Sequence, residues 1–144
     1  MDEEIQARGC EFFSMKETIL IAEDCEVTQK IIESELMSAG YLVHSVCDGN
    51  SAIESIVSIQ PDLIITDYNM PNMNGIELLM KLHKDTAIDA IPVILIASDS
   101  SLISQGKGSR ALASYWMEKP LDFNALKIVI QSLLTGQSLP FPRK

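Results

Sequence analysis

Short apolar runs alternate with stretches of helical periodicity along most of this 144-residue chain. The runs are too short for helices and are rich in Ile, Val and Leu, which is typical of buried strands. A strand, a helix and a further strand of the same sheet form a parallel unit with a right-handed crossover. Repetition of this unit predicts an α/β fold with a parallel sheet that helices cover on both faces. The predicted strands are residues 18–22, 41–46, 63–67, 91–97 and 115–118.

The helices between these strands are predicted from apolar residues at helical spacing and from residues that favour helix ends. Gly40 ends the first helix, Asp48 begins the second and Asn74 begins the third. Asp122 and Gly136 bound the last helix. The residues expected to face the core are Val27, Ile31, Ile32, Leu36 and Ala39 in the first helix, Ala52, Ile56 and Val57 in the second, and Leu126, Val129, Ile130, Leu133 and Leu134 in the last.

The two ends of the chain lack this alternation. Residues 1–17 show no sustained period and are expected to form a flexible N-terminal extension or a short docking helix. Residues 136–144 contain two prolines and are expected to form a loose C-terminal tail. The predicted domain is therefore residues 18–135, and a chain of this length supports one hydrophobic core. We expect a single-domain protein.

Acidic residues outnumber basic ones, with 20 Asp and Glu against 11 Lys and Arg and a net charge of −9. Nucleic acids and anionic membranes repel such a chain, so neither is expected as a direct partner. No apolar run is long enough for membrane insertion, and the acidic N-terminus does not resemble a signal peptide. The three cysteines are widely spaced and favour a reducing, cytoplasmic location. Among them, Cys25 is expected to be a small buried residue.

Polar residues follow four of the five predicted strands. Glu23 and Asp24 come after the first strand, and Asp67 is at the carboxyl end of the third. Ser98 comes after the fourth strand and Lys119 after the fifth. The carboxyl ends of parallel strands meet at one edge of the sheet, where α/β folds place their ligands. We therefore expect these side chains to form one site, in which Glu23 has the weakest claim because it can also simply face solvent.

Carboxylates that lie close together repel one another, and a hard divalent cation relieves this repulsion. Mg²⁺ suits one or two carboxylates together with water and phosphate oxygens, and it neutralises charge on a phosphoryl group during transfer. Lys119 would add a second positive charge to the site. Asp67 can then act as a nucleophile toward a phosphoryl donor and form an aspartyl phosphate.

These motifs closely resemble the receiver domain of CheY-like response regulators. The resemblance rests on Glu23-Asp24 after the first strand, on Asp67 followed by Met70-Pro71 and Gly75, and on Lys119-Pro120 after the fifth strand. The motifs are weak singly but specific in their joint order and spacing, and they cover about residues 17–135. The resemblance implies a flavodoxin-like, doubly wound sheet of five strands in the order 2-1-3-4-5.

The resemblance also implies a role for each matching residue. Asp67 would accept the phosphoryl group from a histidine kinase or a phosphotransfer protein, and Lys119 would pair with that group or with Asp67. The carboxylates of Asp24 and Asp67 and the backbone carbonyl of Asn69 would bind Mg²⁺, with Glu23 acting directly or through water. A downstream effector protein would read the phosphorylated state of a monomer or weak dimer. The chain would not be an enzyme, beyond assisting its own phosphorylation and dephosphorylation.

The positions that govern switching match the family least. The switch hydroxyl at the end of the fourth strand falls on Ala97, with Ser98 one residue later, and the switch aromatic residue falls on Trp116. Either Ser98 rotates toward the phosphoryl oxygen, or its backbone N–H substitutes and the coupling to Trp116 is weak. In the family the side chains that match Asn69 and Asp99 flank the path of the hydrolysing water, so these two residues are expected to set the lifetime of the phosphorylated state.

Three alternatives follow from the same residues. A degenerate receiver that acts as a phosphorylation-independent interaction module is motivated by Ala97 and by Gly106 and Gly108, which each cost the predicted fourth helix about 1 kcal/mol. A phosphatase of the haloacid-dehalogenase type is disfavoured because its second acid would fall on Asn69. Flavin binding is disfavoured because two acids end the first strand, where a phosphate would need backbone N–H donors.

Overall fold

The computed structural model describes residues 16–70, 73–84, 90–98 and 113–136. The predicted fourth helix with its two glycines, Asp99, and both ends of the chain (residues 1–15 and 137–144) lie outside the described residues. The elements in chain order are β1 (Thr18–Ala22), α1 (Glu26–Ser38), β2 (Leu42–Val46), α2 (Gly49–Ile59), β3 (Leu63–Asp67), α3 (Gly75–Leu82), β4 (Val93–Ala97), β5 (Tyr115–Glu118) and α6 (Phe123–Thr135).

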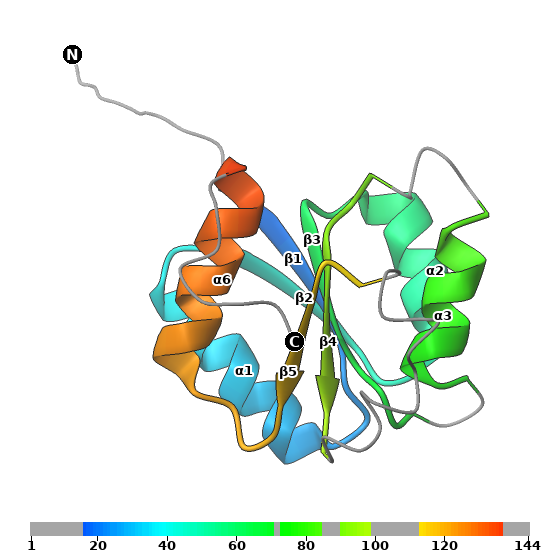
Figure 1. Cartoon of the computed structure of the whole chain (residues 1–144), viewed down its shortest axis with the longest axis horizontal. Coiled ribbons are helices and arrows are strands. Elements are labelled where there is room, and N and C mark those ends of the chain that lie inside the picture. The colour runs from blue at the N-terminus through cyan, green and yellow to red at the C-terminus, as the bar shows by residue number, and fades with distance from the viewer. Residues whose placement is uncertain (1–15, 71–72, 85–89, 99–112, 137–144) are drawn as a thin grey trace.

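The five strands form one parallel sheet in the order β2-β1-β3-β4-β5. Helices α1 and α6 cover one face of this sheet, and α2 and α3 cover the other (Figure 1). Each face therefore has its own apolar core, and Trp116 belongs to the core beneath α2 and α3. The predicted doubly wound fold and its strand order are confirmed.

Two strands differ slightly from their predicted bounds. β2 begins at Leu42 and β4 begins at Val93, one and two residues later than expected. Pro92 has no N–H to donate to the sheet, and its carbonyl accepts a hydrogen bond from the Ile64 N–H at 3.0 Å. β3 spans Leu63–Asp67 and ends at Asp67, as predicted. The backbone of Asp67 is therefore held by the sheet itself.

The predicted inner face of α1 is wrong in part. Ile32 and Leu36 are buried as expected, but Val27 is 68% exposed and Ile31 is 48% exposed. Successive residues turn by about 100° around a helix, so Val27 lies about 140° from Ile32 and cannot share its face. Val57 in α2 is exposed for the same reason, because its neighbour in the chain points into the core.

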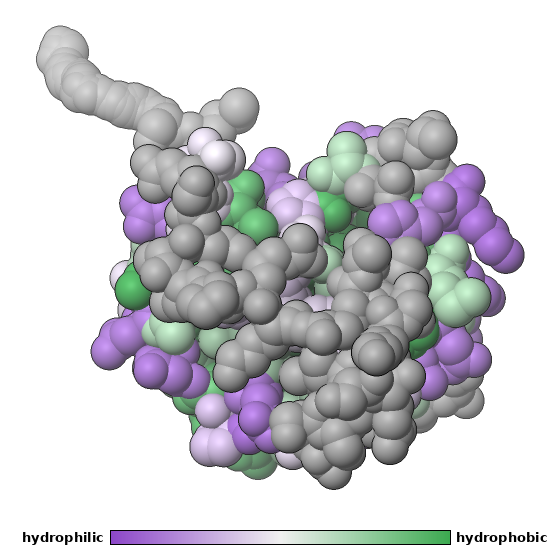
Figure 2. Space-filling view, viewed as in Figure 1, coloured by the Kyte–Doolittle hydropathy of each residue, from purple (hydrophilic) through white to green (hydrophobic). Residues whose placement is uncertain are grey.

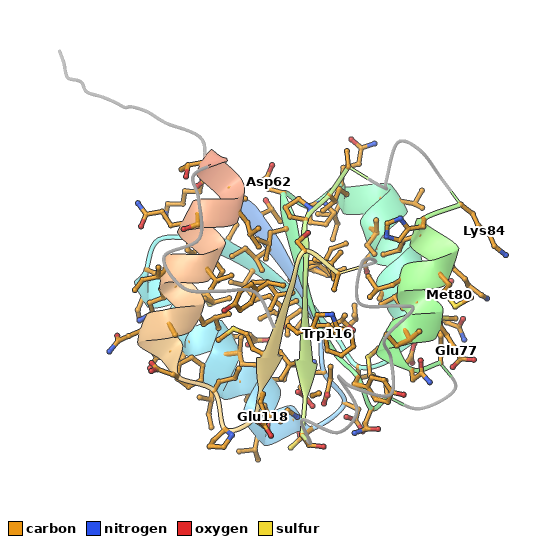
Figure 3. The ribbon with its side chains drawn as sticks, in the orientation of Figure 1. Asp62, Glu77, Met80, Lys84, Trp116 and Glu118 are labelled. Carbon is orange, nitrogen blue, oxygen red and sulfur yellow. The ribbon has the colours of Figure 1, made fainter. Side chains whose placement is uncertain are left out.

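The described surface mixes hydrophilic and hydrophobic side chains on the face shown in Figure 2. α3 illustrates the mixture, since Glu77, Met80 and Lys84 all point outward from it or from the turn that follows it (Figure 3). Leu78 and Leu79 on its other side are fully buried. In the parts of the chain that the structure describes, no helix has both the length and the apolar character needed to cross a membrane.

Candidate functional site

Asp67 ends β3, the central strand of the sheet. Its side chain is only 4% exposed. One carboxylate oxygen accepts a hydrogen bond from Lys119 Nζ at 2.8 Å, and the other accepts one from the backbone N–H of Asn69 at 3.3 Å. Lys119 follows β5, which is two strands away, so the sheet brings together residues that are far apart in the chain.

Glu23 is a second buried acid at this edge of the sheet. It is 2% exposed, so the alternative that it simply faces solvent is wrong. Its Oε1 accepts a hydrogen bond from Lys119 Nζ at 3.2 Å, and its Oε2 accepts one from the backbone N–H of Cys25 at 3.1 Å. Burial raises the pKa of Glu23 and the charge of Asp67 adds to this, although the Cys25 N–H and Lys119 act in the opposite direction.

Lys119 forms ion pairs with both buried acids. Partial burial alone would lower the pKa of Lys119. The hydrogen bond and charge of Asp67, together with those of Glu23, outweigh this and raise the pKa. Lys119 therefore provides a permanent positive charge at neutral pH, placed between two carboxylates.

Asp24 completes an acidic cluster. One carboxylate oxygen from each of Glu23, Asp24 and Asp67 lies within 4.8 Å of the other two. Asp24 is exposed, and no other described residue pairs with its carboxylate. Three carboxylates against one ammonium leave two negative charges without a counter-charge. A cluster of oxygen donors with this charge fits Mg²⁺ or another hard divalent cation.

A cleft of about 380 Å³ opens over these groups. The side-chain amide of Asn69 donates a long hydrogen bond of 3.5 Å to the Ser98 hydroxyl at its edge. The structure thus brings together the acids, the lysine, Asn69 and Ser98 that the sequence predicts for the site. The lining residues are Glu23, Asp24, Cys25, Asp67, Tyr68, Asn69, Met70, Asn74, Ser98 and Lys119.

Ala97 and Trp116, the two positions expected to govern switching, do not line the cleft. Ala97 is fully buried and Trp116 is 2% exposed. Both belong to the core beneath α2 and α3, and the Trp116 side chain lies on that side of the sheet (Figure 3). In this conformation Trp116 packs as a core residue.

Cys25 is exposed at the edge of the cleft, so its predicted burial is wrong. It is the N-cap residue of α1, and its backbone N–H points to the Glu23 carboxylate. This leaves its side chain outside the sheet core, where hydrogen bonding with Thr28 lowers the pKa of the thiol. The apolar pattern of β1 ends at Ala22, three residues before Cys25, so it does not predict the conformation of this turn.

A family model described as the response regulator receiver domain matches residues 19–131. The chain belongs to this family, whose members act in two-component signalling. The resemblance inferred from the sequence motifs is therefore confirmed.

Individual relatives agree with this assignment. The chain is 32% identical over 125 residues to the probable transcriptional regulator ycf29 of Pyropia yezoensis, a match that covers 87% of the chain but 56% of that relative. The chain therefore spans little more than half of the length of ycf29.

Solved structures show the same fold. The chemotaxis response regulator CheY4 of Vibrio cholerae is 26% identical, with a TM-score of 0.76 over 83% of this chain and 100% of CheY4. The receiver domain of sensor histidine kinase PA1611 from Pseudomonas aeruginosa PAO1, which has a magnesium ion coordinated in its active site cleft, is 24% identical. Its TM-score is 0.75 over 84% of this chain and 99% of that domain.

Proposed function

We propose that this receiver accepts a phosphoryl group on Asp67, in a reaction that depends on Mg²⁺ and Lys119, as a step of two-component or phosphorelay signalling. The contact between Asp67 and Lys119 carries this proposal. It joins a nearly buried carboxylate to an ammonium group at 2.8 Å, at the floor of an open cleft that holds two further acids.

Asp67 is the nucleophile in the proposed reaction. One of its carboxylate oxygens forms a bond to phosphorus, the bond from phosphorus to the nitrogen or oxygen of the donor breaks, and the donor keeps the electron pair. Lys119 offsets the negative charge that the phosphoryl group brings next to Asp67. Ser98 donates its hydroxyl to a phosphoryl oxygen, in place of the hydroxyl that Ala97 lacks. Asn69 and Asp99 set the lifetime of the product.

Glu23, Asp24, Asp67 and the backbone carbonyl of Asn69 would hold Mg²⁺ in this reaction. When bound, the ion neutralises charge on the phosphoryl group and aligns it for transfer. The support is the set of three carboxylate oxygens within 4.8 Å of one another. The magnesium ion of PA1611, in a domain with the same fold, agrees with this assignment.

The proposed partners are a histidine kinase or phosphotransfer protein as donor and an effector protein as reader. The receiver acts as a monomer or weak dimer, and its chemistry is limited to its own phosphorylation and dephosphorylation. We place this activity in the cytoplasm, because Cys25 and Cys47 are both free, exposed thiols and such thiols fit a reducing compartment.

Mass spectrometry of the intact protein after incubation with acetyl phosphate and Mg²⁺ tests the acceptor. We expect the wild type to gain one phosphoryl group and Asp67→Asn to gain none. Asp62→Asn is a matched control, because Asp62 is an exposed carboxylate before β3 that accepts a hydrogen bond from the Thr18 N–H at 2.7 Å. Labelling of Asp67→Asn at the wild-type level, or no labelling of the wild type, contradicts the proposal.

A degenerate receiver that binds partners without phosphorylation is the second candidate. The observation that favours it is the burial of Ala97 and Trp116 in one core, because Ala97 has no hydroxyl that could couple Trp116 to a phosphoryl group. The emission of Trp116, the single tryptophan, distinguishes the two candidates. A change in emission or in partner affinity on phosphorylation of Asp67 excludes the constitutive module.

A further inference from the structure

Gln29 of α1 makes two hydrogen bonds next to the site that the proposed reaction does not use. Its side-chain Nε2 donates to the backbone carbonyl of Glu23 at 3.1 Å and to that of Val46 at 3.0 Å. These carbonyls lie at the carboxyl ends of β1 and β2, which are neighbours in the sheet. One side chain therefore ties α1 to the ends of two strands.

The amide group of Gln29 has only one favourable orientation. Both hydrogens on Nε2 have a carbonyl acceptor, whereas the reversed amide would point its oxygen at two other oxygens. The Val46 carbonyl also accepts a hydrogen bond from the backbone N–H of Glu23 at 3.0 Å. Glu23 is thus held through its backbone N–H and its backbone carbonyl alike.

The carbonyl that Gln29 holds belongs to the peptide bond between Glu23 and Asp24. Because a peptide bond is planar, fixing this carbonyl also fixes the direction in which the chain enters Asp24. Asp24 depends on this support, since it is exposed and its carboxylate pairs with no other described residue. The side chain of Glu23, in contrast, is also held by Lys119.

We infer that Gln29 is a positioning residue for the divalent cation. It holds the peptide between Glu23 and Asp24 so that their carboxylates meet that of Asp67 within 4.8 Å. This role rests on the proposed function, because it assumes that the three acids bind Mg²⁺. Gln29 acts through the backbone, since its two side-chain hydrogen bonds go to carbonyl groups and not to the acids themselves.

Calorimetric titration of Mg²⁺ into the full chain, with no phosphoryl donor present, tests this role. Gln29→Met keeps the side-chain length but removes both donors, and we expect its Kd for Mg²⁺ to rise about tenfold. Gln29→Glu presents an oxygen to both carbonyls and should bind Mg²⁺ still more weakly. Lys30→Met is the matched control, because Lys30 is the next residue of α1 and is exposed, and it should keep the wild-type Kd.

A kinetic readout separates positioning from folding. In labelling by acetyl phosphate, Gln29→Met should need more Mg²⁺ for half of its maximal rate but should reach the wild-type rate at saturating Mg²⁺, as expected when only binding is lost. Gln29→Arg retains N–H donors and should bind Mg²⁺ more tightly than Gln29→Met.

Measurements on Gln29→Met and on the wild type separate the role of Gln29 from Mg²⁺ binding itself. A folded Gln29→Met variant with the wild-type Kd overturns the role of Gln29 but leaves the proposed function intact. Equal weakening in Gln29→Met and Gln29→Arg also overturns it, because the donors would then not matter. A wild-type chain that binds no Mg²⁺ overturns both.

Discussion

Lys119 offsets the negative charges of two buried acids that would otherwise repel each other. Its ammonium group lies 3.2 Å from Glu23 and 2.8 Å from Asp67, and these carboxylates are 2% and 4% exposed. Buried carboxylates that lose a counter-charge are strongly destabilising. The lysine therefore supports the fold as well as the proposed chemistry.

We predict that Lys119→Met lowers the free energy of unfolding by about 1–3 kcal/mol without Mg²⁺, because both acids then lack a hydrogen-bonded cation. Added MgCl₂ should recover part of this loss, because a divalent cation can replace the missing charge. Urea unfolding with EDTA and with MgCl₂ measures both effects.

Lys127→Met is the control for the loss of a lysine ion pair. Lys127 contacts Glu35 at 2.9 Å, but these side chains are 34% and 41% exposed. Exposed pairs contribute less than about 1 kcal/mol. Equal destabilisation by Lys119→Met and Lys127→Met would show that the buried acids do not need Lys119.

Ser98 follows Ala97 in the chain and brings a hydroxyl to the lining of the cleft. We predict that Ser98→Ala lowers the steady-state level of labelled protein about tenfold, which corresponds to one hydrogen bond to a charged group. Ser98→Thr keeps the hydroxyl and should retain most of the labelling. Phosphoryl content is measured by mass spectrometry at fixed acetyl phosphate. Unchanged labelling of Ser98→Ala would assign this contact to the backbone instead.

The site residues could be predicted where strand topology alone decides their place. Asp67, Asp24 and Lys119 fall at strand ends, and parallel strands bring those ends together. The burial of Glu23 and the exposure of Cys25 depend instead on how the chain turns from β1 into α1. The hydrogen bonds of Gln29 depend on the same turn, so they could not be predicted from the sequence pattern.

Among the elements, α3 packs closely against the end of β3. A Cβ on Gly75, the first residue of α3, would lie 2.5 Å from Leu95 Cδ1 and 2.8 Å from the backbone oxygen of Asp67. The Gly75 N–H also donates to the Tyr68 carbonyl at 2.8 Å. The missing side chain at Gly75 therefore lets the helix approach the strand that carries the proposed acceptor.

We predict that Gly75→Ala destabilises the protein by about 1–3 kcal/mol, because the added methyl group meets backbone as well as a side chain. Labelling at Asp67 should fall in the fraction that remains folded, since the backbone of Asp67 must move. Met80→Ala, a change on the exposed side of the same helix, should change stability by less than about 0.5 kcal/mol. Thermal unfolding and mass spectrometry measure the two effects, and a Gly75→Ala variant as stable as Met80→Ala would contradict the packing argument.

Helix positions were predicted better than helix faces. The caps at Asp48, Asn74 and Asp122 all accept hydrogen bonds from the first turns of their helices, because a cap is a local arrangement. The inner face of α1 is a tertiary property. Val27 and Ile32 both fit a helical period. Packing against the sheet determines that the helix face containing Ile32 is the buried one.

At the scale of the whole molecule, the sheet separates two cores, and among the residues that the structure describes none is buried in both. Tyr115 and Trp116 follow one another in β5 and point to opposite faces, as neighbours in a strand do. Tyr115 faces the core beneath α1 and α6 and is 5% exposed. Burial raises the pKa of its phenol group.

We predict that this shift makes the fold less stable at alkaline pH. Above about pH 10 an unfolded tyrosine loses its proton while folded Tyr115 keeps it, so the unfolded state binds fewer protons and the free energy of unfolding falls as pH rises. Below that pH the contribution is constant. Tyr115→Phe should show a shallower decline, measured by urea unfolding across that range, and an identical decline in the variant would contradict the assignment.

The contact between Lys119 and Glu23 joins residues 96 positions apart, which follow the first and the last strand in the chain. A chain leaving the ribosome therefore contains all three acids long before it contains their lysine. Until β5 takes its place at the edge of the sheet, Glu23 and Asp67 lack the ammonium group that pairs with both of them. If Asp67 is the acceptor, only a chain that has been synthesised and folded through Lys119 can be phosphorylated. Phosphorylation would then select complete, folded receivers.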